Sequence, residues 1–426
     1  MTVALSLFLF LALLVIGLPV FLALGITSMV LFFVGAEPAI GFATQMLNDI
    51  NSSTLLAVPF FVMAAVFMER GGIALALVEF AAVWVGRVRG GLGIVCVMAC
   101  SIFAAICGSS VATALAMGTV LIPPMLNRGY DKRFTYGLIA ASGTLGILIP
   151  PSLPMILFAL VAEQSVPRLF LAGVVPGVLQ ALVFATWSVI HGYRKGYPKE
   201  PAMGRREFVR ANVKALPALS VPVIVAVGIY GGLVTVSEAA ALSAAVALLV
   251  GVMAYRGFRW LEVPEIVAEG LLSCSKIIII IIMALIFGHW MTKVGVSQAL
   301  VSLVVDSGLK SWQFLLAVNL LLLFLGIFLE GASMILIAVP LLIPMLGPLG
   351  IDPVHFAVIV TLNVEIALIH PPIGLNLFVL SSLREGSMPD VVMGVIPFLL
   401  LLLMLLFIVT YVPSLSLWLP NLVYGR

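Results

Sequence analysis

The chain has 426 residues and a formal net charge of +3; 63% of its residues are hydrophobic and only 9% are charged. A soluble protein of this length needs far more polar surface, which excludes an ordinary soluble globular domain. Because long apolar runs recur from one end to the other, the composition predicts an all-α polytopic membrane protein.

Ten apolar segments are predicted to span the membrane, five in each half of the chain. In the first half they cover residues 3–17, 20–36, 53–69, 134–162 and 169–190. In the second half they cover residues 215–233, 236–255, 273–292, 354–383 and 390–412. The first segment follows no basic residues and precedes no Ala-x-Ala cleavage site, so we interpret it as a span and not as a signal peptide.

Residues 191–214 form the only long polar connection, and they separate residues 1–190 from residues 215–426. This basic connection is interpreted either as a segment lying on the anionic inner leaflet or as a plain solvated linker. Five spans per half is an odd number, so the second half must cross the membrane in the opposite direction. The sequence therefore predicts two inverted repeats.

Each half carries extra material between its third and fourth spans. A short amphipathic stretch comes first, at residues 72–88 and 295–305. Two apolar helices follow, each near or below the roughly 20 residues that a full crossing needs. They meet at a small polar tip, which predicts a re-entrant hairpin at about residues 91–126 and another at about 312–346. The tips are Gly108-Ser109-Ser110 and Glu330-Gly331-Ala332-Ser333.

The positive charges indicate the orientation of the chain. With the N-terminus outside, 17 of the 21 lysines and arginines fall on the cytoplasmic side. Only Arg168, Lys293, Lys310 and Arg426 fall outside. This excess matches the positive-inside rule. The first hairpin is therefore predicted to enter from the cytoplasm and the second from the opposite face.

A cassette repeats after each hairpin. Asp131 lies 19 residues before Pro150-Pro151, and Asp352 lies 19 residues before Pro371-Pro372. Proline lacks the N–H that an α-helix needs, so it interrupts a span. We expect four breaks: the two tips, the segment 142–152 and the segment 363–376. Duplicated, interrupted apolar segments at matching places in two halves are typical of the binding site of a secondary transporter.

Broken helices in a membrane expose backbone carbonyl groups, and serine, threonine and asparagine add further neutral oxygens. Such oxygens suit Na⁺, and half-helix N-termini suit an anionic substrate. We expect about two Na⁺ sites, each between a tip and the downstream break of its own half. The candidate Na⁺ ligands are Gly108, Ser109, Ser110, Gly143, Thr144, Gly146, Gly331, Ser333, Asn363, Gly374 and Asn376.

The substrate is expected between the two tips, where the helices that follow them begin. Its candidate contacts are Ser109, Ser110, Thr113, Pro151, Ala332, Ser333 and Pro372. The alternative for glycine and serine at these places is plain helix packing. Glu330 and Glu365 are intramembrane acids that keep proton coupling open. His370 either takes a direct role or caps freed carbonyl groups.

At these residues the chain resembles the large membrane subunit of tripartite ATP-independent periplasmic (TRAP) transporters. The resemblance covers nearly the whole chain and rests on six stretches together. Two positions depart from the family pattern, Cys107 before the first tip and His370 before the second proline pair. The matching stretches begin at Leu56, Gly108, Ile122, Gly146, Gly350 and Pro371.

The resemblance implies an elevator-type, Na⁺-coupled importer of a small organic acid, multi-pass in a bacterial inner membrane and not an enzyme. It implies two partners, a small four-helix membrane subunit and a periplasmic substrate-binding protein. It also implies that the hairpins and broken spans move, while the first, second, sixth and seventh spans and the amphipathic stretches form a scaffold.

Two other readings remain open. One is a stand-alone ion-coupled anion carrier of the divalent-anion/ion transporter type, which would transport without partners. The other is a non-transporting membrane scaffold or channel, which would show no saturable coupled uptake. The sequence contains no Gly-x4-Gly-Lys-Ser/Thr motif for nucleotide binding, so the energy must come from an ion gradient or another chain.

Overall fold

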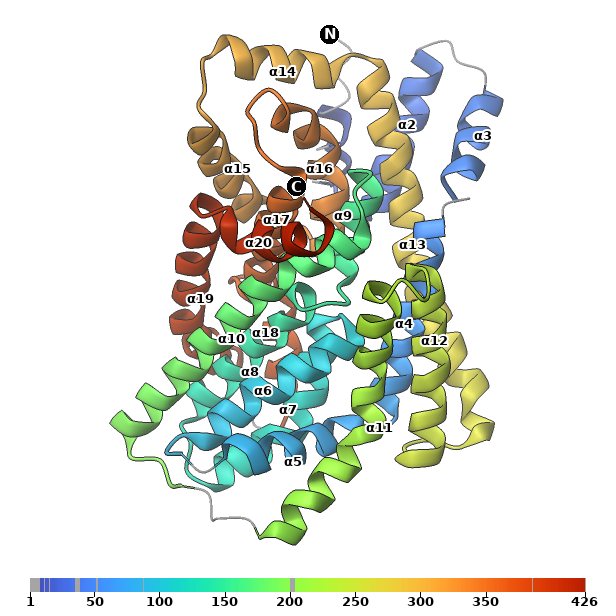
Figure 1. Cartoon of the computed structure of the whole chain (residues 1–426). Helices are drawn as coiled ribbons and strands as arrows, with labels where there is room; N and C mark the ends of the chain where they lie inside the picture. The colour runs from blue at the N-terminus through green and yellow to red at the C-terminus, as the bar shows by residue number, and fades with distance from the viewer. Residues whose placement is uncertain are drawn as a thin grey trace.

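The computed structural model describes residues 8–10, 12–14, 16–34, 39–50, 53–86, 88–199, 204–384 and 386–425. Over these residues the chain is built of helices and contains no strand, which confirms the predicted all-α class (Figure 1). Apolar side chains of both halves join in one large buried core.

The first half contains nine described helices, numbered as in Figure 1. They are α2 (Val20–Val34), α3 (Ala39–Ile50), α4 (Ser53–Arg70), α5 (Ile73–Val85), α6 (Gly91–Cys107), α7 (Ser110–Asn127), α8 (Lys132–Leu148), α9 (Leu153–Val161) and α10 (Val166–Lys195).

The second half repeats the same order of arm, hairpin, broken span and long helix, from α14 to α19. Its helices are α11 (Arg205–Tyr230), α12 (Val236–Leu249), α13 (Val263–Lys293), α14 (Val296–Asp306), α15 (Ser311–Leu325), α16 (Gly331–Leu346), α17 (Pro353–Ile369), α18 (Leu375–Ser381), α19 (Met388–Tyr411) and α20 (Ser414–Tyr424). A π-helical turn, Val250–Ala254, continues α12, and a 3-10 turn, Trp260–Glu262, precedes α13.

The predicted ten full spans are only partly confirmed. By length and composition, 7 described helices could cross a membrane, or 8 if the pair α4 and α5, bent by 75°, counts as one. Helix α2 has 15 residues and is about 22 Å long, shorter than a hydrocarbon core of roughly 30 Å. The predicted span 3–17 lies partly outside the described residues. Helices α3 and α20 were not predicted.

The predicted amphipathic stretches form α5 and α14, which lie at opposite ends of the molecule (Figure 1). This placement agrees with two halves that run in opposite directions. The basic start of α11 lies at the same end as α5 (Figure 1). The predicted linker at 191–214 is mostly helical, because α10 continues to Lys195 and α11 begins at Arg205.

The helices form two groups by their contacts, and the groups also touch each other where α6 packs against α4 and α5 and where α13 packs against α16. In the first group α4 packs against α12 and α13, α13 packs against α2 and α3, and α11 packs against α5 and α12. In the second group α8 packs against α6, α7, α17 and α19. The hairpins also reach across the halves: α7 packs against α18, and α16 packs against α9.

Helices α8 and α19 cross so closely that only glycine fits at the contact. A Cβ on Gly394 would lie 1.9 Å from the Arg133 carbonyl oxygen, and one on Gly137 would lie 2.0 Å from the Gly394 carbonyl oxygen. At this crossing the backbones of the two halves of the chain are therefore in direct contact.

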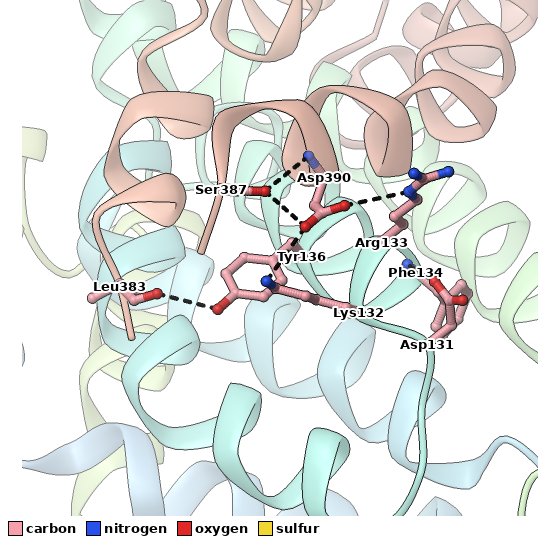
Figure 2. A network of polar contacts seen from close by, with 8 residues as sticks. All are labelled: Asp131, Lys132, Arg133, Phe134, Tyr136, Leu383, Ser387 and Asp390. Carbon is pink, nitrogen blue, oxygen red and sulfur yellow. Dashed lines mark hydrogen bonds and ion pairs between the residues drawn. The ribbon is translucent and has the colours of Figure 1, made fainter. Parts of the chain in front are cut away.

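Polar contacts fasten one end of this crossing (Figure 2). Asp390 accepts from Ser387 at 2.7 Å and forms ion pairs with Lys132 and Arg133, each at 3.3 Å. The hydroxyl of Tyr136 donates to the Leu383 carbonyl at 3.1 Å. Because the ion pairs are partly exposed, we assign the close packing, and not these charges, the larger share of the stability.

Candidate functional site

The first tip turns at Gly108, between α6 and α7. Gly108 has φ of 60°, and a Cβ there would lie 2.6 Å from the Pro151 carbonyl oxygen. Ser109 is the N-cap of α7, and its hydroxyl accepts from the Ala112 amide at 3.4 Å. The tip thus rests directly on the downstream proline break, as the sequence predicted for this half.

Thr113 lies in the first turn of α7 and is fully buried. Its hydroxyl donates to the Ser109 carbonyl at 2.7 Å, and the Cys107 Sγ lies 3.3 Å away from the same hydroxyl. The Thr113 side chain therefore stabilises the shape of the tip, and its expected contact with the substrate stays a prediction.

The proline breaks are shorter than predicted. Residues 142–146 belong to the continuous helix α8, and Asn363 belongs to the continuous helix α17. The chain leaves the helical conformation only at residues 149–152 and 370–374. A proline disturbs the helix within the turn before it, so its effect does not reach back to Ser142 or Asn363.

The two breaks share local features. The Pro150-Pro151 and Pro371-Pro372 peptide bonds are both cis. At the first break the Ser152 hydroxyl donates to the Ile147 carbonyl and accepts from the Met155 amide at 3.4 Å. At the second break the Gly374 amide donates to the His370 carbonyl at 3.0 Å. The buried Nδ1 of His370 has no hydrogen-bond partner among the described residues, so the structure shows no capping of carbonyl groups by this ring nitrogen.

Helix α8 presents two different faces to its neighbours. Gly143 and Gly146 face α7, since a Cβ on them would lie 3.0 Å from Ala114 Cβ and from the Ser109 carbonyl oxygen, respectively. Thr144 points elsewhere, toward α10 and α17. The side chain of Thr144 is therefore not in the first tip site in which it was expected.

The second tip is longer than predicted, because α15 ends at Leu325 and α16 begins at Gly331. Ser333 is fully buried, and its hydroxyl donates to Glu330 Oε1 at 3.4 Å. A Cβ on Gly331 would lie 2.3 Å from Val364 Cγ1, so this tip packs against α17. Ala332 is partly buried and Pro372 is exposed.

Asn376 corrects the expected pairing of tips and breaks. It follows the second break, and the sequence analysis assigned it to the second tip. Its Nδ2 instead donates to Ser110 Oγ at 2.8 Å and to the Ala140 carbonyl at 3.0 Å. The amide thus belongs to the first tip, because α18 packs against α7 of the other half.

Asn363 belongs to a buried chain of side chains deep in the second half. Its Nδ2 donates to Asn319 Oδ1 at 2.8 Å and to the Ile359 carbonyl at 2.9 Å. Asn319 in turn donates to Thr410 Oγ1 at 3.0 Å. Asn319 was not predicted as a site residue, although an asparagine within an apolar helix was the available signal.

Glu365 lies in a second buried cluster that joins the halves. It is 0% exposed and accepts from Thr144 Oγ1 at 3.4 Å, while Gln180 Nε2 donates to the same threonine oxygen at 3.1 Å. Gln180 is 1% exposed and was missed, although a glutamine in the apolar α10 was visible in the sequence. The cluster draws one residue each from α8, α10 and α17.

Several buried oxygens have no hydrogen-bond partner among the described residues. Oxygens of this kind, four from neutral side chains and one from the Glu365 carboxyl group, suit a hard monovalent cation, and leaving them unpaired is costly. The side-chain oxygens concerned in the two broken spans and α10 are Ser142 Oγ, Gln180 Oε1, Asn363 Oδ1, Glu365 Oε1 and Asn376 Oδ1. The side-chain oxygens present are therefore suitable ligands for Na⁺.

Two cavities open at the tips, and α13 lines both of them. The larger, of about 800 Å³, is lined by Glu330, Gly331 and Ser333 of the second tip. The smaller, of about 270 Å³, is lined by Gly108 and Ser109 of the first tip together with Pro151. Ser273 and Ile277 of α13 line both cavities.

The remaining predicted residues do not line these two cavities. They are Ser110, Thr113, Gly143, Thr144, Gly146, Ala332, Asn363, Pro372, Gly374 and Asn376. Of the predicted Na⁺ ligands of the first tip, Gly108 and Ser109 line the smaller cavity, whereas Ser110 does not. No single cavity among the described residues is lined by both tips, so the expected position of the substrate between them stays a prediction.

Comparison with known proteins gives a consistent result. The family description "Tripartite ATP-independent periplasmic transporter, DctM component" matches residues 7–415. A C4-dicarboxylate TRAP transporter large permease protein from Rhodobacter capsulatus is 39% identical, over 97% of this chain and 98% of that protein. A sialic acid TRAP transporter large permease protein from Vibrio cholerae is 35% identical, over 99% of each chain.

Among solved structures, MtrF from Neisseria gonorrhoeae, described as one of a class of antimetabolite efflux pumps, has a similar fold. The TM-score is 0.66 at 13% sequence identity, and the match covers 89% of this chain and 84% of MtrF. At this identity the likeness concerns the fold alone.

Proposed function

The chain belongs to the family of the DctM component of tripartite ATP-independent periplasmic transporters, and we propose that it imports a small organic acid, coupled to Na⁺, across a bacterial inner membrane. The observation that carries the proposal is the repeated pairing of a polar hairpin tip with a broken span. Both named relatives are similar over nearly their full length, yet they are named for different organic acids. Both names refer to an organic acid, and we therefore propose an organic acid as the substrate class.

The first proposed Na⁺ site lies at the first tip. Gly108, Ser109 and Ser110 contribute oxygens there, Gly143 and Gly146 allow α8 to approach, and Asn376 supplies its unpaired Oδ1. The second site lies at the second tip, with Gly331, Ser333, Asn363 and Gly374. Bound Na⁺ supplies positive charge beside the start of α7 and of α16, where a substrate carboxylate would gain from it.

The protein side of the mechanism follows from the packing. Each hairpin contacts the broken span of its own half and the half-helix of the other half. The hairpins and broken spans therefore make one connected unit that can move as a body, whereas α2, α4, α11, α12 and α13 pack against one another. We propose that the first unit moves against the second as an elevator. Helices α4 and α13, which correspond to the third and eighth predicted spans, are thus added to the scaffold expected from the sequence.

Two partners belong to this proposal: a small four-helix membrane subunit and a periplasmic binding protein that delivers the acid. The test is uptake of succinate and of N-acetylneuraminate into proteoliposomes that contain the assembled transporter. We expect uptake of one acid to require an inward Na⁺ gradient and the binding protein. Equal uptake with a proton gradient alone would contradict Na⁺ coupling, and uptake by the chain alone would support a stand-alone carrier.

A further inference from the structure

The larger cavity has two walls of different origin. The second tip forms one wall, with Glu330, Gly331 and Ser333, and the middle of α13 forms another, with Ser273 and Lys276. The tip belongs to the group of helices that we propose to move, and α13 belongs to the scaffold. A ligand in this cavity would therefore touch both units.

Lys276 gives this cavity a positive charge that comes from α13 and not from the tip. Among the described residues, Lys276 and Glu330 are the only charged side chains that line it. Lys276 is exposed, and no acidic group among the described residues lies within ion-pair distance of its ammonium group. Glu330 already accepts from Ser333 at 3.4 Å. Lys276 therefore forms no ion pair in the described structure, although the Glu330 carboxyl group lines the same cavity.

The position of Lys276 makes this lack of an ion pair costly. The charge count placed Lys276 on the cytoplasmic side, near the edge of the predicted span 273–292. In the structure it lies near the middle of the 31-residue helix α13, directly before a run of six isoleucines, Ile277–Ile282. A charge at such a place is expensive unless it faces water or an opposite charge, and intramembrane charges usually mark a substrate path. An anion that enters the cavity would supply the missing partner.

We propose that Lys276 binds the carboxylate of the transported acid from the scaffold side of the larger cavity. This inference rests on the proposed function, and it adds a substrate contact outside the hairpins. A lysine ammonium is a compact charge on a flexible stem, so it can follow a carboxylate as the tip moves. The start of α16 faces the same cavity through Gly331 and adds a favourable dipole end.

The test compares Lys276→Gln with Lys276→Arg in the purified full-length chain with its membrane partner. Binding of succinate and of N-acetylneuraminate is measured from the rise in melting temperature with ligand concentration. For the acid that the wild type binds, we expect Lys276→Gln to weaken binding about tenfold or more, as loss of a charge-assisted hydrogen bond does. Lys276→Arg should remain within about threefold, because the charge is kept.

Lys195→Gln is the matched control, since it removes one exposed positive charge from the last turn of α10, outside the cavity. It should bind like the wild type. If Lys276→Gln binds the acid as tightly as the wild type, or if the arginine variant fails as badly as the glutamine variant while both remain folded, the inference is wrong. If neither acid binds to the wild type, the proposed function itself fails, and the inference falls with it.

Discussion

At the residue scale, the proposed first Na⁺ site includes one side chain from the far end of the sequence. Asn376 joins Ser110 at 2.8 Å, although 266 residues separate them. The amide donates through Nδ2 and leaves Oδ1 without a partner in the described structure. An asparagine held in this way is a positioned neutral oxygen, which is what a Na⁺ site needs.

Replacing Asn376 should therefore act on sodium more than on assembly. We expect Asn376→Ala to raise the Na⁺ concentration for half-maximal uptake by about tenfold, because one charge-assisted ligand contact is lost. Uptake is measured at increasing Na⁺ and saturating substrate. Asn212→Ala is the control, because Asn212 bonds to Trp84 at the outer surface of α11. An unchanged Na⁺ dependence in Asn376→Ala would remove this residue from the site.

The cluster of Glu365, Thr144 and Gln180 gives a prediction about stability. In Thr144→Val both Glu365 and Gln180 lose their hydrogen bond with the threonine hydroxyl inside the core. Leaving buried polar groups unpaired costs about 1–3 kcal/mol. We expect a lower melting temperature for the purified variant. Thr119→Val should change it far less, since the hydroxyl of Thr119 bonds only to a carbonyl of its own helix.

At the element scale, the sequence predicted the hairpins and proline breaks because each has a local signature. The polar tips, the paired prolines and Asp131 and Asp352 at matching distances are visible without a structure. The structure adds that both aspartates are N-caps: Asp131 accepts from the Phe134 amide at 3.1 Å and Asp352 from the Val354 amide at 2.7 Å. The repeated spacing is thus the length of one half-helix with its cap.

What the sequence could not predict was contact between distant elements. Nothing local to Asn376 indicates that α18 packs against α7, and nothing local to Thr144 indicates that its hydroxyl faces α10 and α17. Helices α3 and α20 have only 12 and 11 residues, too few to be recognised as spans. The breaks predicted from the prolines were also too long, because residues 142–146 remain helical in the buried core.

The crossing of α8 and α19 should be the most sensitive packing contact between the halves. Gly394→Ala would place a Cβ 1.9 Å from the Arg133 carbonyl oxygen, so the helices would have to separate. Overpacking of this kind typically costs about 1–3 kcal/mol or more. We expect reduced yield and a lower melting temperature. Gly347→Ala is the control, because a Cβ there meets open space, and equal stability of the two variants would contradict the account.

At the scale of the whole molecule, the charge pattern and the repeated element order agree on an inverted architecture. Helices α5 and α14 lie at opposite ends, and the basic start of α11 lies with α5 (Figure 1). By the positive-inside rule, we expect the connection between the halves to lie in the cytoplasm.

Cysteine labelling tests this orientation. Gly204 and Gly347 both have open space where a Cβ would lie, so each accepts a cysteine, and the four native cysteines are buried. In intact spheroplasts we expect Gly204→Cys to resist an impermeant thiol reagent and Gly347→Cys to react with it. Permeabilised cells supply the control, in which both should react. The reverse pattern in intact cells would overturn the predicted orientation.

The central claim is that each of two hairpin tips holds one sodium ion against a broken span. Equilibrium binding of radioactive sodium to the purified, assembled transporter tests it most directly. The account predicts about two ions per chain, and about one ion in each of two variants, Ser110→Leu and Ser333→Leu, that still assemble with the small subunit. No saturable sodium binding by the wild type, or an unchanged number of ions in both variants, would contradict it.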